Sequence, residues 1–241
     1  MLKLSLLLGT VAALADVAGG FVLVRAEGIQ KYLRYFVALG AGFLMATSVL
    51  EMLPESLKLD PKLAPVLVMA GYCALHFLEH TIVAHFHFGK ETHHGEFVSA
   101  HTSYSVMGGL AVHALFDGVA IGSGFAINDL LGWLIFLAIF LHKAPEGFTM
   151  ASIMLASGRS GRTAMLSAGV LAAATLAGVL VIGLAPGMVR FGLPVSAGVA
   201  LYVAATDLVP EVNREPGIRM ALVFFAGVAG FLALRMLMPS M

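Results

Sequence analysis

Long apolar runs separated by short polar stretches make up almost the whole chain. A helix needs about 20 mostly apolar residues to cross a bilayer. Eight runs meet that length: residues 4–24, 33–57, 63–86, 103–126, 130–157, 163–185, 190–212 and 217–238. The breaks between them are polar or rich in glycine and proline, as in RAEGIQKYLR, KLDPK and SGRSGR. The pattern predicts an all-α polytopic membrane protein with eight transmembrane helices, forming a single transmembrane domain over residues 1–241.

The amino-acid composition supports a membrane protein and gives no reason to expect nucleic acid as a partner. The chain is 59% hydrophobic and 12% charged, whereas a soluble domain carries about a quarter charged residues. Its formal net charge of zero gives no electrostatic reason to expect nucleic acid as a partner. The single cysteine, Cys73, cannot form an internal disulfide or a thiolate metal cluster. The first run is longer than the apolar core of a signal peptide and contains Asp16, so we expect it to be a retained span.

The distribution of lysine and arginine predicts an orientation. With the N-terminus outside, eight basic residues fall in cytoplasmic loops: Arg25, Lys31, Arg34, Lys90, Arg159, Arg162, Arg214 and Arg219. Five fall outside: Lys3, Lys58, Lys62, Arg190 and Arg235. We therefore expect a multi-pass protein of the cell membrane with both termini extracytoplasmic. The loop over residues 87–102, which contains His93, His94 and His101, would then be a cytoplasmic histidine-bearing loop.

The second and seventh spans end alike, which suggests an internal repeat. One ends ATSVLEMLPES and the other AATDLVPEV, so Glu51 precedes Glu55 as Asp207 precedes Glu211. Spans 1–3 and 6–8 could be inverted copies around a central pair, a common transporter plan. Chance similarity is the alternative. The prolines in both segments should loosen the helix beside these acids.

The fourth and fifth spans carry the most informative pattern. VHALFDG at 112–118 and LHKAPEG at 141–147 each place a histidine four residues before a carboxylate. Residues four apart share one helix face, so His113 points with Asp117 and His142 with Glu146. The loop around residues 128–129 is short, so the two spans should pack antiparallel. If their faces meet, two imidazoles and two carboxylates converge, a donor set that suits Zn²⁺ or Fe²⁺.

The cost of burying these groups favours a metal site over simple packing. A charged side chain at the bilayer centre costs at least ~2.5–3.5 kcal/mol, so the acids need a compensating interaction. Hydrogen-bonded packing histidines are the alternative, but the motif occurs twice. Lys143 lies beside His142 and would either pair with the acids or snorkel to the membrane surface. Asp16 could pair with Lys143 or line a cavity.

Several further polar residues are candidates for a transport pathway. Glu51 and Glu55 would lie near the outer end, and Asp207 and Glu211 near the inner end. In the third span, His76, Glu79 and His80 share a face by their spacing. For the four helix-end acids the alternative is ordinary solvation at the membrane interface.

Here the sequence resembles a known family. HKAPEG, HALFDG, LPES and DLVPE look like the ZIP family of divalent metal transporters. The resemblance implies an eight-span transporter, not an enzyme, which moves metal into the cytoplasm through a mid-membrane site. It implies Zn²⁺ as the substrate, with Fe²⁺, Mn²⁺ and Cd²⁺ as alternatives. On that pattern, the residues that match the primary metal ligands are His113, Asp117, His142 and Glu146.

The chain also departs from the family pattern. Where the fourth span of the family reads His-Asn-x-Pro-Glu-Gly, this chain has Ala114, Phe116 and Asp117, which puts the kink of that helix in doubt. Lys143 stands where two-metal members have a ligand, and the sixth span has no acid. We therefore predict a single metal ion, with Lys143 balancing the carboxylates in place of a second cation.

Two other functions remain open from the sequence. The same ligands could activate water in an intramembrane zinc-dependent hydrolase, although the chain has no His-Glu-x-x-His motif. A metal sensor or scaffold without flux is the third reading. Nothing resembles a nucleotide-binding loop, so transport would not be driven directly by ATP. The expected partners are divalent metal ions and the lipid bilayer, with a homodimer left open and no nucleic acid.

Overall fold

A computed structural model describes residues 2–25, 30–81, 100–214 and 217–238. Within these ranges every regular element is a helix, which confirms the all-α prediction. In chain order they are α1 (Leu2–Arg25), α2 (Gln30–Thr47), the π-helical segment η1 (Ser48–Met52), α3 (Leu53–Leu59), α4 (Ala64–Thr81), α5 (Ala100–Ile127), α6 (Asp129–Ala156), α7 (Gly161–Leu184), the 3₁₀ turn η3 (Pro186–Met188), α8 (Val189–Tyr202), the π-helical segment η4 (Val203–Leu208), α9 (Val209–Arg214) and α10 (Ile218–Leu237).

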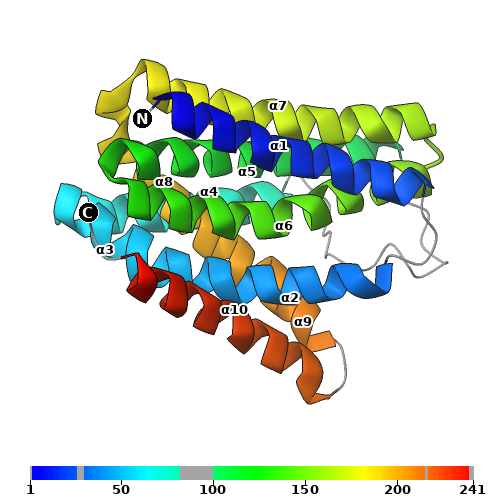
Figure 1. The fold of residues 1–241 in the computed structure, drawn as a ribbon. Helices are drawn as coiled ribbons and strands as arrows, with labels where there is room; N and C mark the ends of the chain where they lie inside the picture. Colours follow the sequence, from blue (N-terminus) through cyan, green and yellow to red (C-terminus); the bar gives the residue numbers. More distant parts are fainter. Residues whose placement is uncertain (1, 26–29, 82–99, 215–216, 239–241) are drawn as a thin grey trace.

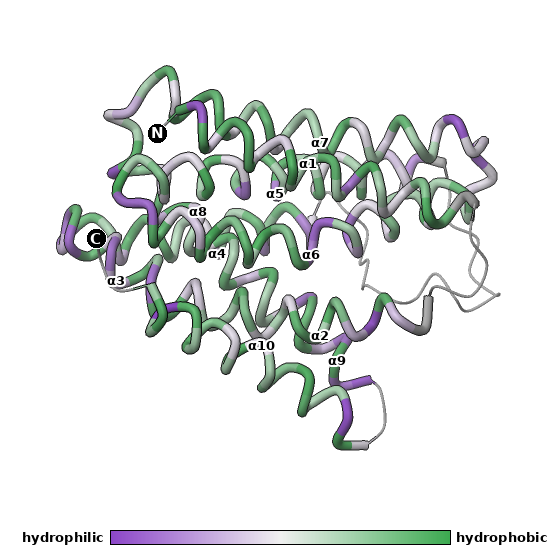
Figure 2. Tube along the Cα trace, in the orientation of Figure 1, coloured by the Kyte–Doolittle hydropathy of each residue, from purple (hydrophilic) through white to green (hydrophobic). Residues whose placement is uncertain are grey.

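Among the described residues, seven helical stretches are long and apolar enough to cross a membrane. Figure 2 shows hydrophobic residues along most of each helix, with hydrophilic ones at many ends and turns and a hydrophilic stretch within α6. The eighth run that we predicted, residues 63–86, corresponds to α4, which is described only as far as Thr81. Of the predicted loop over 87–102, residues 87–99 lie outside the described ranges, as do His93 and His94. Residues 100–102 are already helical because α5 begins at Ala100.

The helices pack as two groups that meet at α5 and α6. In one group α1 lies against α6 and α7, and α5 lies against α7; in the other, α4 packs on α8 and α10 on α2. Figure 1 shows α1 and α7 along one side of the bundle and α2 and α10 along the other. The start of α1 and the end of α10 lie at the same end of the bundle (Figure 1). This is the arrangement expected if both termini face the same side of a membrane.

Glycines bring the backbones of the first group into contact. A Cβ atom at Gly118 of α5 would overlap the carbonyl oxygen of Thr175 in α7. A Cβ atom at Gly147 of α6 would likewise overlap the carbonyl oxygen of Asp16 in α1. Small residues permit such close approach between membrane helices. They hold α1, α5, α6 and α7 together tightly around the buried charges described below.

The two similar acid-and-proline segments share an irregular backbone. Glu51 lies in η1 and Asp207 in η4, and each π-helical segment is followed by a helix with proline as its second residue. Proline has no N–H and clashes with the carbonyl four residues earlier, so the hydrogen-bond ladder shifts locally to a wider register. The predicted loosening beside both acids is therefore observed. The inverted arrangement of spans 1–3 and 6–8 stays a prediction.

Candidate metal centre

The two helices that carry the repeated histidine motif form a tight antiparallel hairpin. α5 ends at Ile127 and α6 begins at Asp129, so Asn128 alone joins them. The Asn128 side chain accepts a hydrogen bond from the backbone N–H of Leu131 at 2.8 Å, which caps the start of α6. The short connection that the sequence predicted is therefore present. It places the two motif-bearing faces opposite each other.

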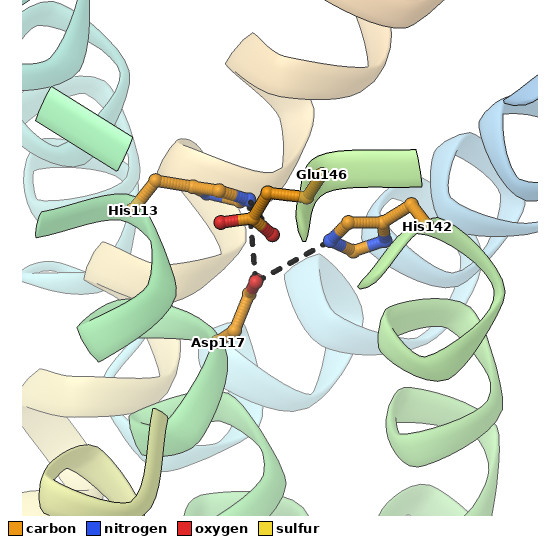
Figure 3. Close-up of side chains that lie close together, drawn as sticks. All are labelled: His113, Asp117, His142 and Glu146. Carbon is orange, nitrogen blue, oxygen red and sulfur yellow. Dashed lines mark hydrogen bonds and ion pairs between the residues drawn. The ribbon is translucent and has the colours of Figure 1, made fainter. Parts of the chain in front are cut away.

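The structure brings the four predicted ligands together. His113, Asp117, His142 and Glu146 are all buried, and each offers one ligand atom within 4.8 Å of the others. Figure 3 shows their side chains converging from the two helices, with Asp117 between the imidazoles. Asp117 Oδ2 lies 3.2 Å from His113 Nε2 and 3.3 Å from His142 Nε2. Their role as metal ligands stays a prediction, which the geometry now makes specific.

The spacing of these atoms fits a tetrahedral dication. Zinc bonds to nitrogen and oxygen are about 2.0–2.2 Å long, and a tetrahedron with such bonds has ligand atoms about 3.3–3.6 Å apart. Besides the two distances above, His113 Nε2 lies 3.9 Å from Glu146 Oε2. These three separations differ from the tetrahedral values by a few tenths of an ångström, and all four ligand atoms lie within 4.8 Å of one another.

The hydrogen bonding of His142 orients its ring for binding. Its Nδ1 lies 2.9 Å from the carbonyl oxygen of Ala138. A carbonyl only accepts, so Nδ1 carries the proton and donates, and in the neutral ring Nε2 presents its lone pair to the cluster. Such a second hydrogen bond is the usual support of a metal-binding histidine.

Lys143 lies inside the cluster instead of snorkelling. Its side chain is fully buried, and its Nζ donates to Glu146 Oε2 at 2.7 Å and lies 2.9 Å from Asp117 Oδ2. Asp16 of α1 is also fully buried, with Oδ2 3.7 Å from the same ammonium. Of the two alternatives for Asp16, the structure therefore shows pairing with Lys143.

A small cavity adjoins the four side chains. It measures about 10 Å³, room for about one water molecule. His113, His142 and Glu146 line one side, and Glu79 and Asp207 line it as well. The remaining lining residues are apolar: Leu110, Val203 and Leu208. Two of the candidate pathway acids thus lie next to the cluster, although they come from α4 and η4.

The other candidate pathway residues do not line this cavity. Glu55 pairs with Lys58 at 2.8 Å, and Glu211 pairs with Arg214 at the same distance. Glu51 pairs with Arg235 of α10 at 2.5 Å. His76 and His80 are exposed on α4, with ring centroids 4.1 Å apart. A role for these five residues in transport stays a prediction.

One polar contact at the cavity was not predicted from the sequence. The Tyr202 hydroxyl donates to Glu79 Oε2 at 2.9 Å and so positions this acid. Nothing in the local sequence indicated the contact, because it depends on α8 packing against α4. The fourth span, without the proline of the family pattern, forms one continuous α-helix from Ala100 to Ile127.

More than half of the chain, residues 98–235, matches the family model described as ZIP zinc transporter. The chain belongs to the ZIP family. Both helices of the candidate metal centre lie within the matched ZIP region. Together with the seven apolar helices, membership makes this a multi-pass membrane protein.

Individual ZIP relatives match over about half of the chain. Human "Zinc transporter ZIP5" is 37% identical over 53% of this chain and 25% of its own length. Human "Zinc transporter ZIP4" is 32% identical over 54% of this chain and 20% of its own length. "Zinc transporter ZIP9" of Micropogonias undulatus is 34% identical over 44% of this chain and 38% of its own length. The similarity therefore spans well under half of each of these relatives.

Proposed function

We propose that this chain is a secondary transporter that moves divalent metal ions, above all Zn²⁺, across the cell membrane into the cytoplasm. The ion would bind at a single site formed by His113, Asp117, His142 and Glu146. The observation that carries the proposal is the buried set of two imidazoles and two carboxylates whose ligand atoms all lie within 4.8 Å of one another, a donor set that zinc takes. The zinc transporters named above support the choice of ion.

The surroundings of the cluster favour one ion instead of two. The ammonium of Lys143 lies within 2.9 Å of both cluster carboxylates, where a second cation would otherwise balance them. The adjacent helix α7 has no acidic residue in its sequence GRTAMLSAGVLAAATLAGVLVIGL. A second metal ion beside the first would therefore have to displace the Lys143 ammonium and would find no acid on α7.

The cavity gives the ion a first step away from the cluster. Glu79 and Asp207 lie on it beside His113 and His142, so their oxygens could receive an ion that leaves the site. The cavity is too small for passage in this conformation, so transport requires movement. Because α1, α5, α6 and α7 pack as one group, tilting of this group against the other helices would open the site alternately to each side. Both termini would lie outside the cell, as the basic residues of the loops indicate.

An intramembrane hydrolase is the second candidate, and the cavity is the observation that favours it. One water molecule next to bound zinc is what metal-assisted hydrolysis requires. A peptide or lipid substrate would need far more space than about 10 Å³. Transport of a bare ion therefore fits this site better.

Zinc influx into proteoliposomes tests the proposal. Purified protein is reconstituted with a zinc-sensitive dye inside the vesicles, and influx is compared for the wild type, His142→Ala and Glu146→Ala. We expect both variants to lose nearly all influx, since each lacks one of four ligands. The control is Gly169→Ala, at a position where a Cβ atom meets no atom within 4 Å, and it should transport normally. Undiminished influx in both ligand variants would refute the site, and zinc binding without any wild-type influx would favour the hydrolase.

Counting bound metal tests the single-ion claim separately. Native mass spectrometry of the zinc-loaded protein should show one tightly held ion. Two ions, both lost in Glu146→Ala, would contradict the role given to Lys143.

A further inference from the structure

The first helix is fixed against the metal-site helix at one point. A Cβ atom at Gly147 would overlap the backbone carbonyl of Asp16, and one at Gly19 would overlap the carbonyl of Ala144. The backbones of α1 and α6 therefore touch directly on either side of this crossing. Glu146 is the residue before Gly147, so the contact holds Asp16 beside the metal site.

The carboxylate of Asp16 is buried without hydrogen bonds. Its side chain is fully inaccessible, and within the described part of the chain neither oxygen has a hydrogen-bond partner. Its ion pair is with Lys143, at 3.7 Å. Burying a carboxylate that has one ion pair and no hydrogen bond lowers the stability of the fold. An uncharged residue would fill the space between α1 and α6 equally well. The charge itself therefore calls for an explanation.

Counting formal charges supplies one. Three carboxylates surround the Lys143 ammonium: those of Asp16, Asp117 and Glu146. With neutral imidazoles, these three negative charges and one positive charge leave a net charge of minus two. Glu79, which accepts a hydrogen bond from Tyr202, and Asp207 line the adjoining cavity and lie outside this count. A single divalent cation brings this buried group to neutrality, which a low-dielectric interior strongly favours.

Asp16 also affects how strongly Lys143 competes with a metal ion. The ammonium contacts Asp117 Oδ2 and Glu146 Oε2, two of the oxygens that a metal would use. Asp16 attracts the same ammonium but is not one of the four ligands. If its charge is removed, Lys143 depends on the two ligand carboxylates alone and competes for them more strongly.

We propose that Asp16 is a positioning and specificity-determining residue of the metal site, which sets its net charge at minus two and thereby fits it to one divalent ion. The inference rests on the proposed function and extends it to a helix that supplies no ligand. Asp16 acts through Lys143 and does not touch the ion.

A charge-compensation cycle tests this role. Zinc affinity of the purified full-length protein in detergent is measured by competition with a fluorescent chelator. Asp16→Asn leaves a net charge of minus one and should weaken zinc binding about 10–100-fold, the range seen when a group supporting a metal ligand is lost. Adding Lys143→Met restores minus two. Affinity in the double variant should return to within about threefold of the wild type, a difference of less than about 0.7 kcal/mol.

Rescue separates a charge role from a packing role. If Asp16 only filled space between α1 and α6, adding Lys143→Met would lower the zinc affinity further instead of restoring it. The double variant leaves Asp117 and Glu146 without the ammonium. Both variants are therefore purified with zinc present, which replaces the missing positive charge, and the chelator removes the zinc only during the measurement. Ser5→Ala is the control on the same helix, because the Ser5 hydroxyl donates within its own turn, to the Leu2 carbonyl. It should leave affinity unchanged.

Each outcome has a distinct meaning. Unchanged affinity in Asp16→Asn, or no recovery in the double variant, would overturn the role of Asp16 while wild-type zinc binding keeps the site intact. Recovery in the double variant together with absent zinc influx in wild-type vesicles would uphold the role of Asp16 and refute transport. A wild-type protein that binds no zinc would overturn both.

Discussion

The charges at the centre of the molecule are arranged differently from those at the helix ends. At the centre, three carboxylates share the single ammonium of Lys143. Toward the helix ends, three acids each pair with one base: Glu55 with Lys58, Glu211 with Arg214 and Glu51 with Arg235. The same residue types thus give a surplus of negative charge in one region and local neutrality in the other.

Exposure separates the two regions as well. The side chain of Lys58 is 73% exposed, whereas that of Lys143 is completely buried. Water and salt compensate exposed charges, so surface pairs contribute little to stability. Charges in the interior depend on one another and on whatever ion binds there. The helix-end acids are therefore accounted for by their own ion pairs, whereas the central cluster keeps a surplus of negative charge that the proposed metal ion would balance.

The largest difference between the regions should appear on removal of the lysine. Lys143→Met leaves three buried carboxylates without their cation, and we expect the apo protein to lose about 3–5 kcal/mol of stability. Lys58→Met removes an exposed partner and should leave stability unchanged. Thermal unfolding in detergent with a chelator present measures both. Saturating zinc should restore much of the loss in Lys143→Met, because a dication replaces the missing charge.

Equal melting temperatures for the two lysine variants would break the comparison. They would mean that water reaches the central cluster as easily as it reaches the helix ends.

A second test concerns the backbone contact that holds Asp16 at the cluster. Gly147→Ala places a methyl group against the Asp16 carbonyl and should cost about 1–3 kcal/mol, as overpacking does. Gly169→Ala is the matched control, because a Cβ atom there meets no atom within 4 Å. It should be neutral or slightly stabilising, since alanine is the better helix former. Chemical unfolding of the two variants in the same detergent gives the difference. A similar cost for both would show that α1 and α6 are not in tight contact.

The sequence could predict the metal cluster because its determinants are local. A four-residue spacing fixes which side chains share a face, and a connection of one residue forces the two helices to be antiparallel neighbours. His113, Asp117, His142 and Glu146 therefore came from two short motifs and one turn. The spans themselves followed from run length.

The surroundings of the cluster could not be predicted in this way. Most spans are apolar on all sides, so periodicity does not tell which face meets which neighbour. Pairing of Asp16 with Lys143 depends on α1 docking on α6, and that of Tyr202 with Glu79 depends on α8 docking on α4. For the same reason the sequence placed Asp207 and Glu211 together on a pathway, whereas only Asp207 lines the cavity.

A third test compares these two acids of one segment. Asp207→Asn should slow zinc influx about tenfold, equivalent to about 1.4 kcal/mol, because an acid beside the cluster no longer receives the ion. Binding at the cluster should remain at one ion, since Asp207 is not among the four ligands. Glu211→Gln should slow influx less than Asp207→Asn, because Glu211 does not line the cavity beside the cluster. Influx from Asp207→Asn vesicles that equals the wild type would remove Asp207 from the pathway.

The smallest effect is expected where a helix-end pair joins two helices. Arg235 of α10 is 46% exposed and Glu51 of η1 is 15% exposed, so their ion pair is only partly shielded from water. Arg235→Gln should lower stability by less than about 1 kcal/mol at low salt. The effect should fade toward zero in 1 M salt, where the Debye length is only about 3 Å. Unfolding midpoints across a salt series measure this, with Lys143→Met run in parallel. The stability lost in Lys143→Met should persist at high salt, because salt screens buried charges much less than exposed ones. If the loss of stability vanished equally in both variants, the centre and the helix ends would not differ.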